Sequence, residues 1–236
     1  MRWSLPLLLL SSVAWADVSV TSSGGFDVTK CTMADGPLRR EEVSLDVKKL
    51  VPQQAWLRQL SRRHLLLASR EWDKSMVLDR ASGKEVMQHP RYEKSPTALV
   101  ENADGSLLGL LELAQGDHRL QLLDVTGKAR WATRPAFDQL SDSASTLVAG
   151  DLLIVATYHR IATGSQLRAY DLKTGTPIWK ADVLQLNVAH SKYWNDVSVE
   201  QLGQSVVLRG FEAGGCYVQT FDIATGKRFS AILPKR

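Results

Sequence analysis

The chain has 236 residues and a formal net charge of +4, and its basic and acidic residues are interleaved along the sequence. Without a continuous basic stripe or a known binding module, the sequence argues against a nucleic-acid-binding protein. The length suits one large all-β domain, because barrels, sandwiches and propellers commonly exceed 200 residues without dividing.

The first 16 residues have the pattern of a secretory signal peptide. Arg2 gives a positive start, an apolar run follows from Leu5, and Ala14-Trp15-Ala16 is a small-x-small cleavage site. The apolar run is shorter than the roughly 20 residues that a membrane-spanning helix needs. We therefore predict cleavage after Ala16, a single mature domain over 17–236, no membrane span, and a secreted or periplasmic location.

Further along the sequence, a short turn motif occurs at four places. Its complete copy is Asp-Leu-Lys-Thr-Gly-Thr-Pro-Ile-Trp at 171–179, and the glycines of the four copies are separated by 44, 48 and 51 residues. In such a turn the Asp carboxylate accepts hydrogen bonds from backbone N–H groups, the glycine adopts a positive φ, and the tryptophan can pack between neighbouring units. The motif residues are Asp79, Gly83, Asp124, Gly127, Trp131, Asp171, Gly175, Trp179, Asp222 and Gly226.

Each repeat contains four predicted strands. In the repeat that ends with the complete motif they are Ser145–Ala149, Leu152–Thr157, Gln166–Tyr170 and Ile178–Ala181. Four strands in a period of 40 to 50 residues is the plan of a propeller blade. The sequence therefore predicts an all-β fold, a small β-propeller of four to five four-stranded antiparallel blades closed into a ring. Met87 and Ser230 replace the tryptophan in the first and last copies, which predicts an altered final contact between blades.

Two further short strands are predicted at the start of the mature chain. Val18–Thr21 and Phe26–Thr29 alternate polar and apolar residues on either side of Gly24-Gly25. We interpret residues 17–50 as a degenerate blade or as ring-closing strands.

The pattern Asp-x-x-Thr-Gly-x-x-x-Trp resembles the repeat of the pyrroloquinoline-quinone-like (PQQ-like) β-propeller superfamily, over about residues 54–233. Members of that superfamily include quinoprotein dehydrogenases and the non-enzymatic assembly lipoprotein BamB. The dehydrogenases use a calcium ion and often a disulfide of adjacent cysteines, and neither can be placed on this sequence. The resemblance implies a BamB-like, non-catalytic scaffold that binds another protein of the cell envelope, without cofactor or metal. The alternative is a small quinone-dependent or other enzyme that uses the propeller channel.

The two cysteines, Cys31 and Cys216, belong to the units that meet if a ring closes. An even cysteine count in an exported protein favours a disulfide, and two buried thiols are the alternative. We predict a Cys31–Cys216 disulfide as a closure of the ring.

One long loop is a candidate binding segment. It contains His190, Lys192, Tyr193 and Trp194 in the longest interval of the repeat series. Long loops on a rigid scaffold often carry binding residues. These four residues either form a recognition surface, or the two aromatic residues plug the channel or cover a blade.

The remaining polar and nucleophilic residues form no known catalytic or phosphate-binding motif. The sequence has no nucleophile elbow, zinc-protease helix or phosphate-binding glycine loop. The five histidines are scattered, and we interpret each as a loop or surface residue. They are His64, His89, His118, His159 and His190.

Overall fold

The computed structural model describes 12 segments of the chain. These are residues 17–21, 26–27, 32–33, 40–44, 55–69, 74–90, 97–113, 119–133, 144–159, 164–184, 196–212 and 215–233. All regular elements within these segments are β-strands, which confirms the predicted all-β class.

Sixteen strands form four antiparallel sheets of four strands each, and the strands of each sheet follow one another in chain order. The first sheet contains β5 (Ala55–Leu60), β6 (His64–Ser69), β7 (Lys74–Asp79) and β8 (Glu85–Pro90). The second contains β9 (Thr97–Glu101), β10 (Leu107–Leu113), β11 (Leu120–Leu123) and β12 (Ala129–Thr133). The third contains β13 (Ala144–Ala149), β14 (Leu152–His159), β15 (Gly164–Asp171) and β16 (Pro177–Lys180). The last contains β17 (Asp196–Leu202), β18 (Ser205–Glu212), β19 (Gly215–Asp222) and β20 (Arg228–Ile232).

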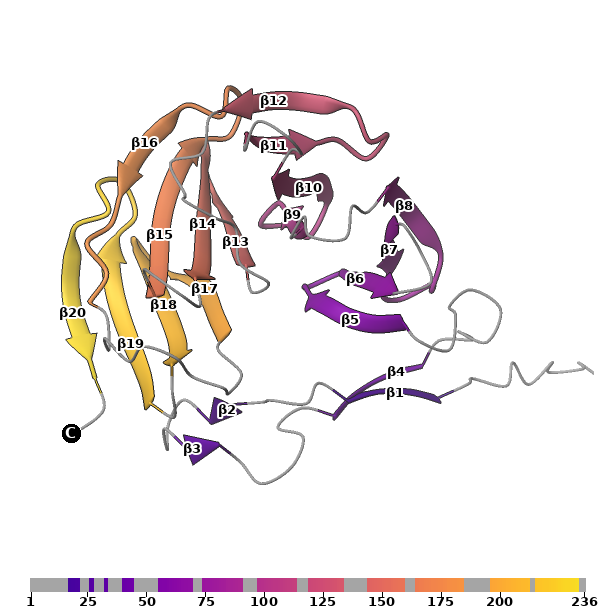
Figure 1. The fold of residues 1–236 in the computed structure, drawn as a ribbon, viewed down its shortest axis with the longest axis horizontal. Coiled ribbons are helices and arrows are strands. Elements are labelled where there is room, and N and C mark those ends of the chain that lie inside the picture. The colour runs from indigo at the N-terminus through magenta and orange to yellow at the C-terminus, as the bar shows by residue number, and fades with distance from the viewer. Residues whose placement is uncertain are drawn as a thin grey trace, which may run out of the picture.

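The four sheets are the predicted propeller blades, arranged side by side around an arc (Figure 1). The first strand of each sheet lies on the inside of the arc and the fourth on the outside. Contacts between the sheets run from each sheet to the next, for example from β9 to β13 and from β13 to β17. The ring that the sequence predicted is not completed by these sheets, because the arc stays open between the last sheet and the first (Figure 1).

Two smaller sheets precede the four blades. β1 (Asp17–Thr21) pairs with β4 (Arg40–Ser44), and β2 (Phe26–Asp27) pairs with β3 (Thr32–Met33). The predicted strand at 18–21 is present, and so is the described part, 26–27, of the predicted strand at 26–29; each pairs with a later strand. Both small sheets lie below the opening of the arc (Figure 1).

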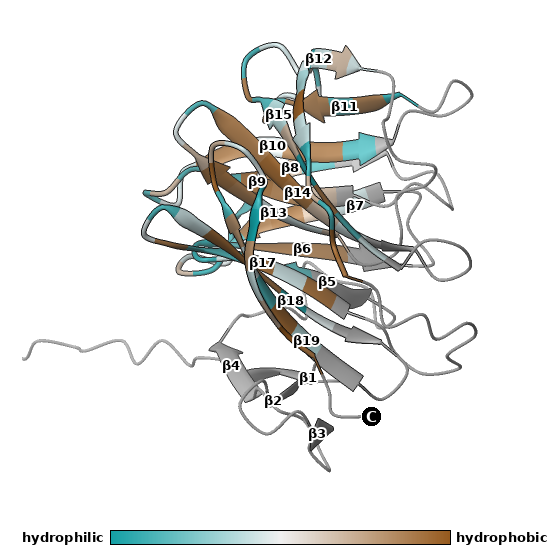
Figure 2. Cartoon of the chain, turned by 90° about the vertical axis from the view of Figure 1, so that its left-hand side faces the viewer, coloured by the Kyte–Doolittle hydropathy of each residue, from teal (hydrophilic) through white to brown (hydrophobic). Residues whose placement is uncertain are grey.

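The core consists of apolar layers between consecutive sheets. Alternation along β14 explains why this strand is so apolar: Leu153 and Val155 pack against the second sheet, whereas Ile154 and Ala156 pack against the last. A strand buried on both faces loses the polar alternation of a half-exposed strand. Figure 2 shows the resulting pattern, with hydrophobic residues along the strands and hydrophilic residues at the turns.

Candidate functional site

The repeated turns connect the third and fourth strands of each sheet. In the complete copy, Asp171 Oδ1 accepts hydrogen bonds from the backbone N–H of Thr174 (2.7 Å) and Lys173 (3.0 Å) and from the Thr174 hydroxyl (2.8 Å). The next residue, Gly175, has a φ of +72° and donates its N–H to the Asp171 carbonyl (2.8 Å). The carboxylate and glycine therefore have the structural role that the sequence predicted.

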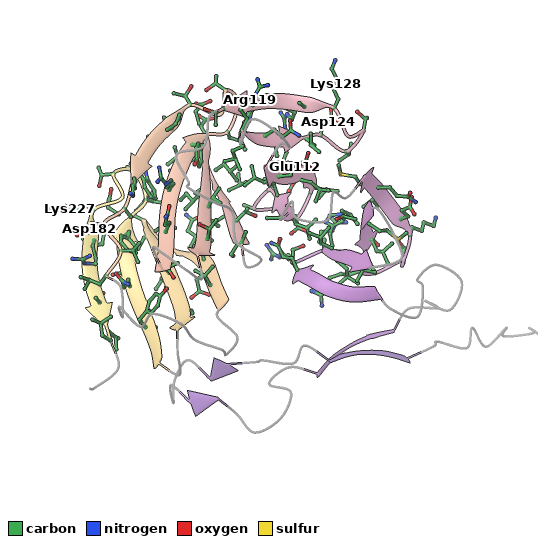
Figure 3. All side chains as sticks on the ribbon, viewed as in Figure 1. Glu112, Arg119, Asp124, Lys128, Asp182 and Lys227 are labelled. Carbon is green, nitrogen blue, oxygen red and sulfur yellow. The ribbon has the colours of Figure 1, made fainter. Side chains whose placement is uncertain are left out.

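The same arrangement occurs in all four copies and has an electrostatic signature. A neighbouring hydroxyl is the largest cause that lowers the pKa of each turn aspartate, and backbone N–H donors add to it, because these hydrogen bonds stabilise the charged carboxylate. The aspartate and hydroxyl pairs are Asp79 with Ser82, Asp124 with Thr126, Asp171 with Thr174, and Asp222 with Thr225. Figure 3 shows the turn of Asp124 and Lys128 at the outer side of the arc.

Each of the two motif tryptophans joins its sheet to the next. Trp131 Nε1 donates a hydrogen bond to the Leu172 carbonyl (2.9 Å), and its ring stacks on Tyr170 with the centroids 6.5 Å apart. A Cβ atom on Gly175 would overlap the Trp131 indole. Trp179 repeats this contact one sheet later, with the Ile223 carbonyl (3.2 Å) and Gly226. The predicted inter-blade packing is confirmed.

Met87, buried in place of a tryptophan, packs between the first and second sheets. A polar cluster lies at the same junction. His64 Nδ1 lies 2.6 Å from Glu101 Oε1, and the Ser61 hydroxyl hydrogen-bonds to the same carboxylate. The interpretation of His64 as a loop or surface residue is wrong, because it begins β6 and is buried.

The sequence offers no signal for this cluster, because Glu101 is 37 residues from His64 and belongs to another sheet. Its geometry is structural and not catalytic, because Ser61 and His64 of the first sheet hydrogen-bond to the Glu101 carboxylate of the second sheet. A nucleophilic serine would hydrogen-bond to the imidazole that removes its proton, whereas the Ser61 oxygen contacts Glu101 and accepts from the His64 backbone N–H (3.2 Å). The Glu101 side chain is 10% exposed, and donors from the neighbouring sheet satisfy its carboxylate, as a largely buried charge requires.

Among the described strands no blade follows the last sheet in the arc, and we name the outward face of this sheet the terminal face. It consists of Glu200, Leu202, Val207, Arg209, Val218, Thr220, Ser230 and Ile232, which share one side of the sheet by strand register. Their counterparts in the third sheet pack against the last sheet and are apolar. In the same order they are Leu147, Ala149, Ile154, Ala156, Leu167, Ala169, Trp179 and Ala181.

The centre of the terminal face combines Val207, which is 4% exposed, and Val218 with polar groups that are paired. Arg209 forms an ion pair with Glu200, and the Thr220 and Ser230 hydroxyls are 2.6 Å apart. Leu202 and Ile232, at opposite ends of the face, are each 70% exposed. The predicted change in the final blade contact is confirmed at Ser230, where the hydroxyl pairs within its own sheet.

The other predicted site residues lie outside the described segments. These are the loop residues His190, Lys192, Tyr193 and Trp194, together with Cys31; the side chain of Cys216, on β19, is likewise not described. The disulfide and the binding loop stay predictions. In the described segments no three His, Cys, Asp or Glu residues gather as a metal site, and no helix there could cross a membrane.

Comparison with solved structures found chains of similar fold. BamB from Moraxella catarrhalis is 12% identical with a TM-score of 0.41, and the match covers 72% of this chain and 61% of that one. Kuenenia stuttgartiensis hydrazine synthase is 13% identical with a TM-score of 0.45, covering 73% and 46%. Quinohemoprotein alcohol dehydrogenase from Comamonas testosteroni is 14% identical with a TM-score of 0.45, covering 75% and 36%. The chain resembles β-propeller proteins.

The match thus spans between 36% and 61% of the length of these solved chains. No protein-family model and no curated protein matches the sequence.

Proposed function

We propose that the protein is an exported, non-catalytic β-propeller scaffold whose terminal face binds another protein of the cell envelope. The signal-peptide pattern of residues 1–16 supports export. The terminal face carries the binding proposal, because it has the position of an inter-sheet contact and none of the four described blades lies against it.

The chemistry of the face suits a protein partner. Leu202 and Ile232 offer apolar side chains that are 70% exposed, in positions where Ala149 and Ala181 contact the next sheet. Exposed apolar side chains on a rigid element serve as anchors in protein interfaces, and the surrounding polar groups give specificity. The Glu200–Arg209 pair supplies such polar groups between the two anchors.

The predicted binding loop adjoins the last sheet in the sequence. Residues 190–194 directly precede β17, the strand that carries Glu200 and Leu202.

The test uses the purified mature chain to capture a protein from an envelope extract. It compares the wild type with variants in which an exposed apolar residue is replaced by aspartate. We expect Leu202→Asp with Ile232→Asp to weaken capture of a saturably bound protein at least tenfold, because a charge would replace each apolar anchor. Ile178→Asp is the matched control, since Ile178 is also apolar and 49% exposed but lies on β16. All variants should keep the wild-type melting temperature. Equal binding by wild type and the double variant would refute the proposal.

A further inference from the structure

Exposed apolar side chains gather on the outermost strand of the last sheet. Each four-stranded sheet ends in an outer strand, and the outer edge of that strand pairs with no described strand. On β20 and directly after it, Phe229, Ile232 and Leu233 are 60%, 70% and 40% exposed. Among the described side chains, β8 and β16 each carry one large exposed apolar residue, Val86 and Ile178, and β12 carries none. β20 therefore differs from the other outer strands.

The outer edge of β20 also lacks the protection that edge strands usually have. Charged residues and prolines on an edge discourage pairing with the strand of another chain. The other three outer strands contain such residues, namely Glu85, Pro90, Arg130, Pro177 and Lys180. The single charged residue of β20, Arg228, is held by the segment after β16, because its guanidinium donates to the Asp182 carbonyl and lies 3.4 Å from the Asp182 carboxylate. Residues 229–232 thus form an uncharged edge.

Backbone hydrogen-bonding groups face outward in the middle of this edge. In the third sheet the Ala181 N–H donates to the Leu167 carbonyl (2.9 Å). Hydrogen-bonded and non-hydrogen-bonded pairs alternate along antiparallel strands, so that the N–H and C=O groups of the preceding residue, Lys180, point away from β15. Ala231 holds the same position in the last sheet, since each residue directly follows the position of the motif tryptophan. The N–H and C=O groups of Ala231 therefore point away from β19.

A second β20 strand fits this edge by its own sequence. Antiparallel pairing about Ala231 lets the backbone groups of this residue exchange two hydrogen bonds with their own copies. The same two-fold register places Phe229 opposite Leu233 of the second copy, twice. The exposed apolar side chains of the edge then face one another, and Arg228 faces no other charge.

We propose that two copies of the protein associate through antiparallel pairing of their β20 strands, which joins the two last sheets into one continuous sheet. The paired edge is short, and small interfaces give weak, reversible association. The dimer therefore forms in a concentration-dependent way. This inference does not rest on the proposed function, because it concerns the edge of the last sheet and its test changes no residue of the terminal face.

The test measures molecular mass by sedimentation of the purified mature chain over a concentration series that reaches roughly 1 mM, where even weak association is populated. We expect the average mass of the wild type to rise from one chain toward two. Ala231→Pro removes the outward N–H and should lower the association constant at least tenfold, because proline is tolerated on an edge but cannot donate. Lys180→Pro is the matched control at the same position of β16 and should associate as the wild type does. A monomeric wild type, or wild-type association of Ala231→Pro, would overturn the proposal.

A pair of double variants tests the register and keeps the proposal falsifiable if the proline variant does not fold. Phe229→Lys with Leu233→Lys sets like charges opposite each other in the two-fold register, whereas Phe229→Lys with Leu233→Glu sets opposite charges there. Both residues are exposed, so the melting temperatures should stay close to that of the wild type. We expect the Lys–Glu variant to associate at least tenfold more strongly than the Lys–Lys variant. Equal association of the two would overturn the proposal.

Discussion

At the scale of single residues, the glycine of the repeated turn has two roles. Gly175 has a positive φ, and it also leaves the space into which Trp131 of the preceding sheet packs. Gly150 provides a matched comparison, since its φ is +60° and a Cβ atom there would meet no atom within 4 Å. The two positions therefore separate backbone strain from inter-sheet packing.

We expect Gly150→Ala to lower the free energy of unfolding by about 1–2 kcal/mol, the cost of a left-handed L-residue. Gly175→Ala should lower it by about 3 kcal/mol or more, because displacement of Trp131 adds an overpacking cost of about 1–3 kcal/mol. Urea unfolding of both variants measures the difference. Equal losses would contradict a direct role of Gly175 in receiving the tryptophan.

At the scale of the element, each turn should make stability sensitive to acid. The Thr174 hydroxyl and backbone N–H groups lower the pKa of Asp171 in the folded protein. A lowered folded pKa gives a stabilising contribution that is present above the unfolded value of about 3.9 and is lost as the pH falls through the folded pKa. Asp171→Asn removes the charge and keeps the side-chain shape.

We expect Asp171→Asn to lower the melting temperature at pH 7, and the gap from wild type to shrink as the pH falls below about 4. Thermal melts between neutral and acid pH measure this. Asp151→Asn serves as the control in the same sheet, because that exposed carboxylate faces Lys173 Nζ at 3.2 Å and surface ion pairs contribute little. If the difference in melting temperature between wild type and Asp171→Asn stayed constant across the pH range, the hydrogen-bonded carboxylate of Asp171 would not be the source of that difference.

The elements were predictable from the sequence because their determinants are local. The strands of the third sheet lie within two residues of their predicted bounds, and the turn glycines have the expected positive φ. The His64–Glu101 contact and the polar terminal face were not predictable in this way. The His64–Glu101 contact joins residues of two different sheets. The polar residues of the terminal face are recognised only when the strand registers of the last two sheets are compared, which aligns Arg209 with Ala156 and Glu200 with Leu147.

At the scale of the whole molecule, the sheets interact with sequence neighbours, so that the arc resembles a short linear array. In such arrays stability is approximately the sum of unit and interface contributions, and an end unit with one interface opens at a lower free energy than an inner unit. The third sheet packs on both sides, whereas the last sheet packs only on the third among the four sheets.

β14 and β18 are matched probes of this difference, because each is the second strand of its sheet and contains eight residues. We expect amides of β18 to exchange at least tenfold faster than those of β14 in the isolated protein, since local opening of the last sheet breaks only one inter-sheet layer. Hydrogen exchange resolved by mass spectrometry over residues 152–159 and 205–212 measures both. Equal protection of the two strands would mean that the arc opens as one cooperative unit, and the last sheet would then not be an independently opening end.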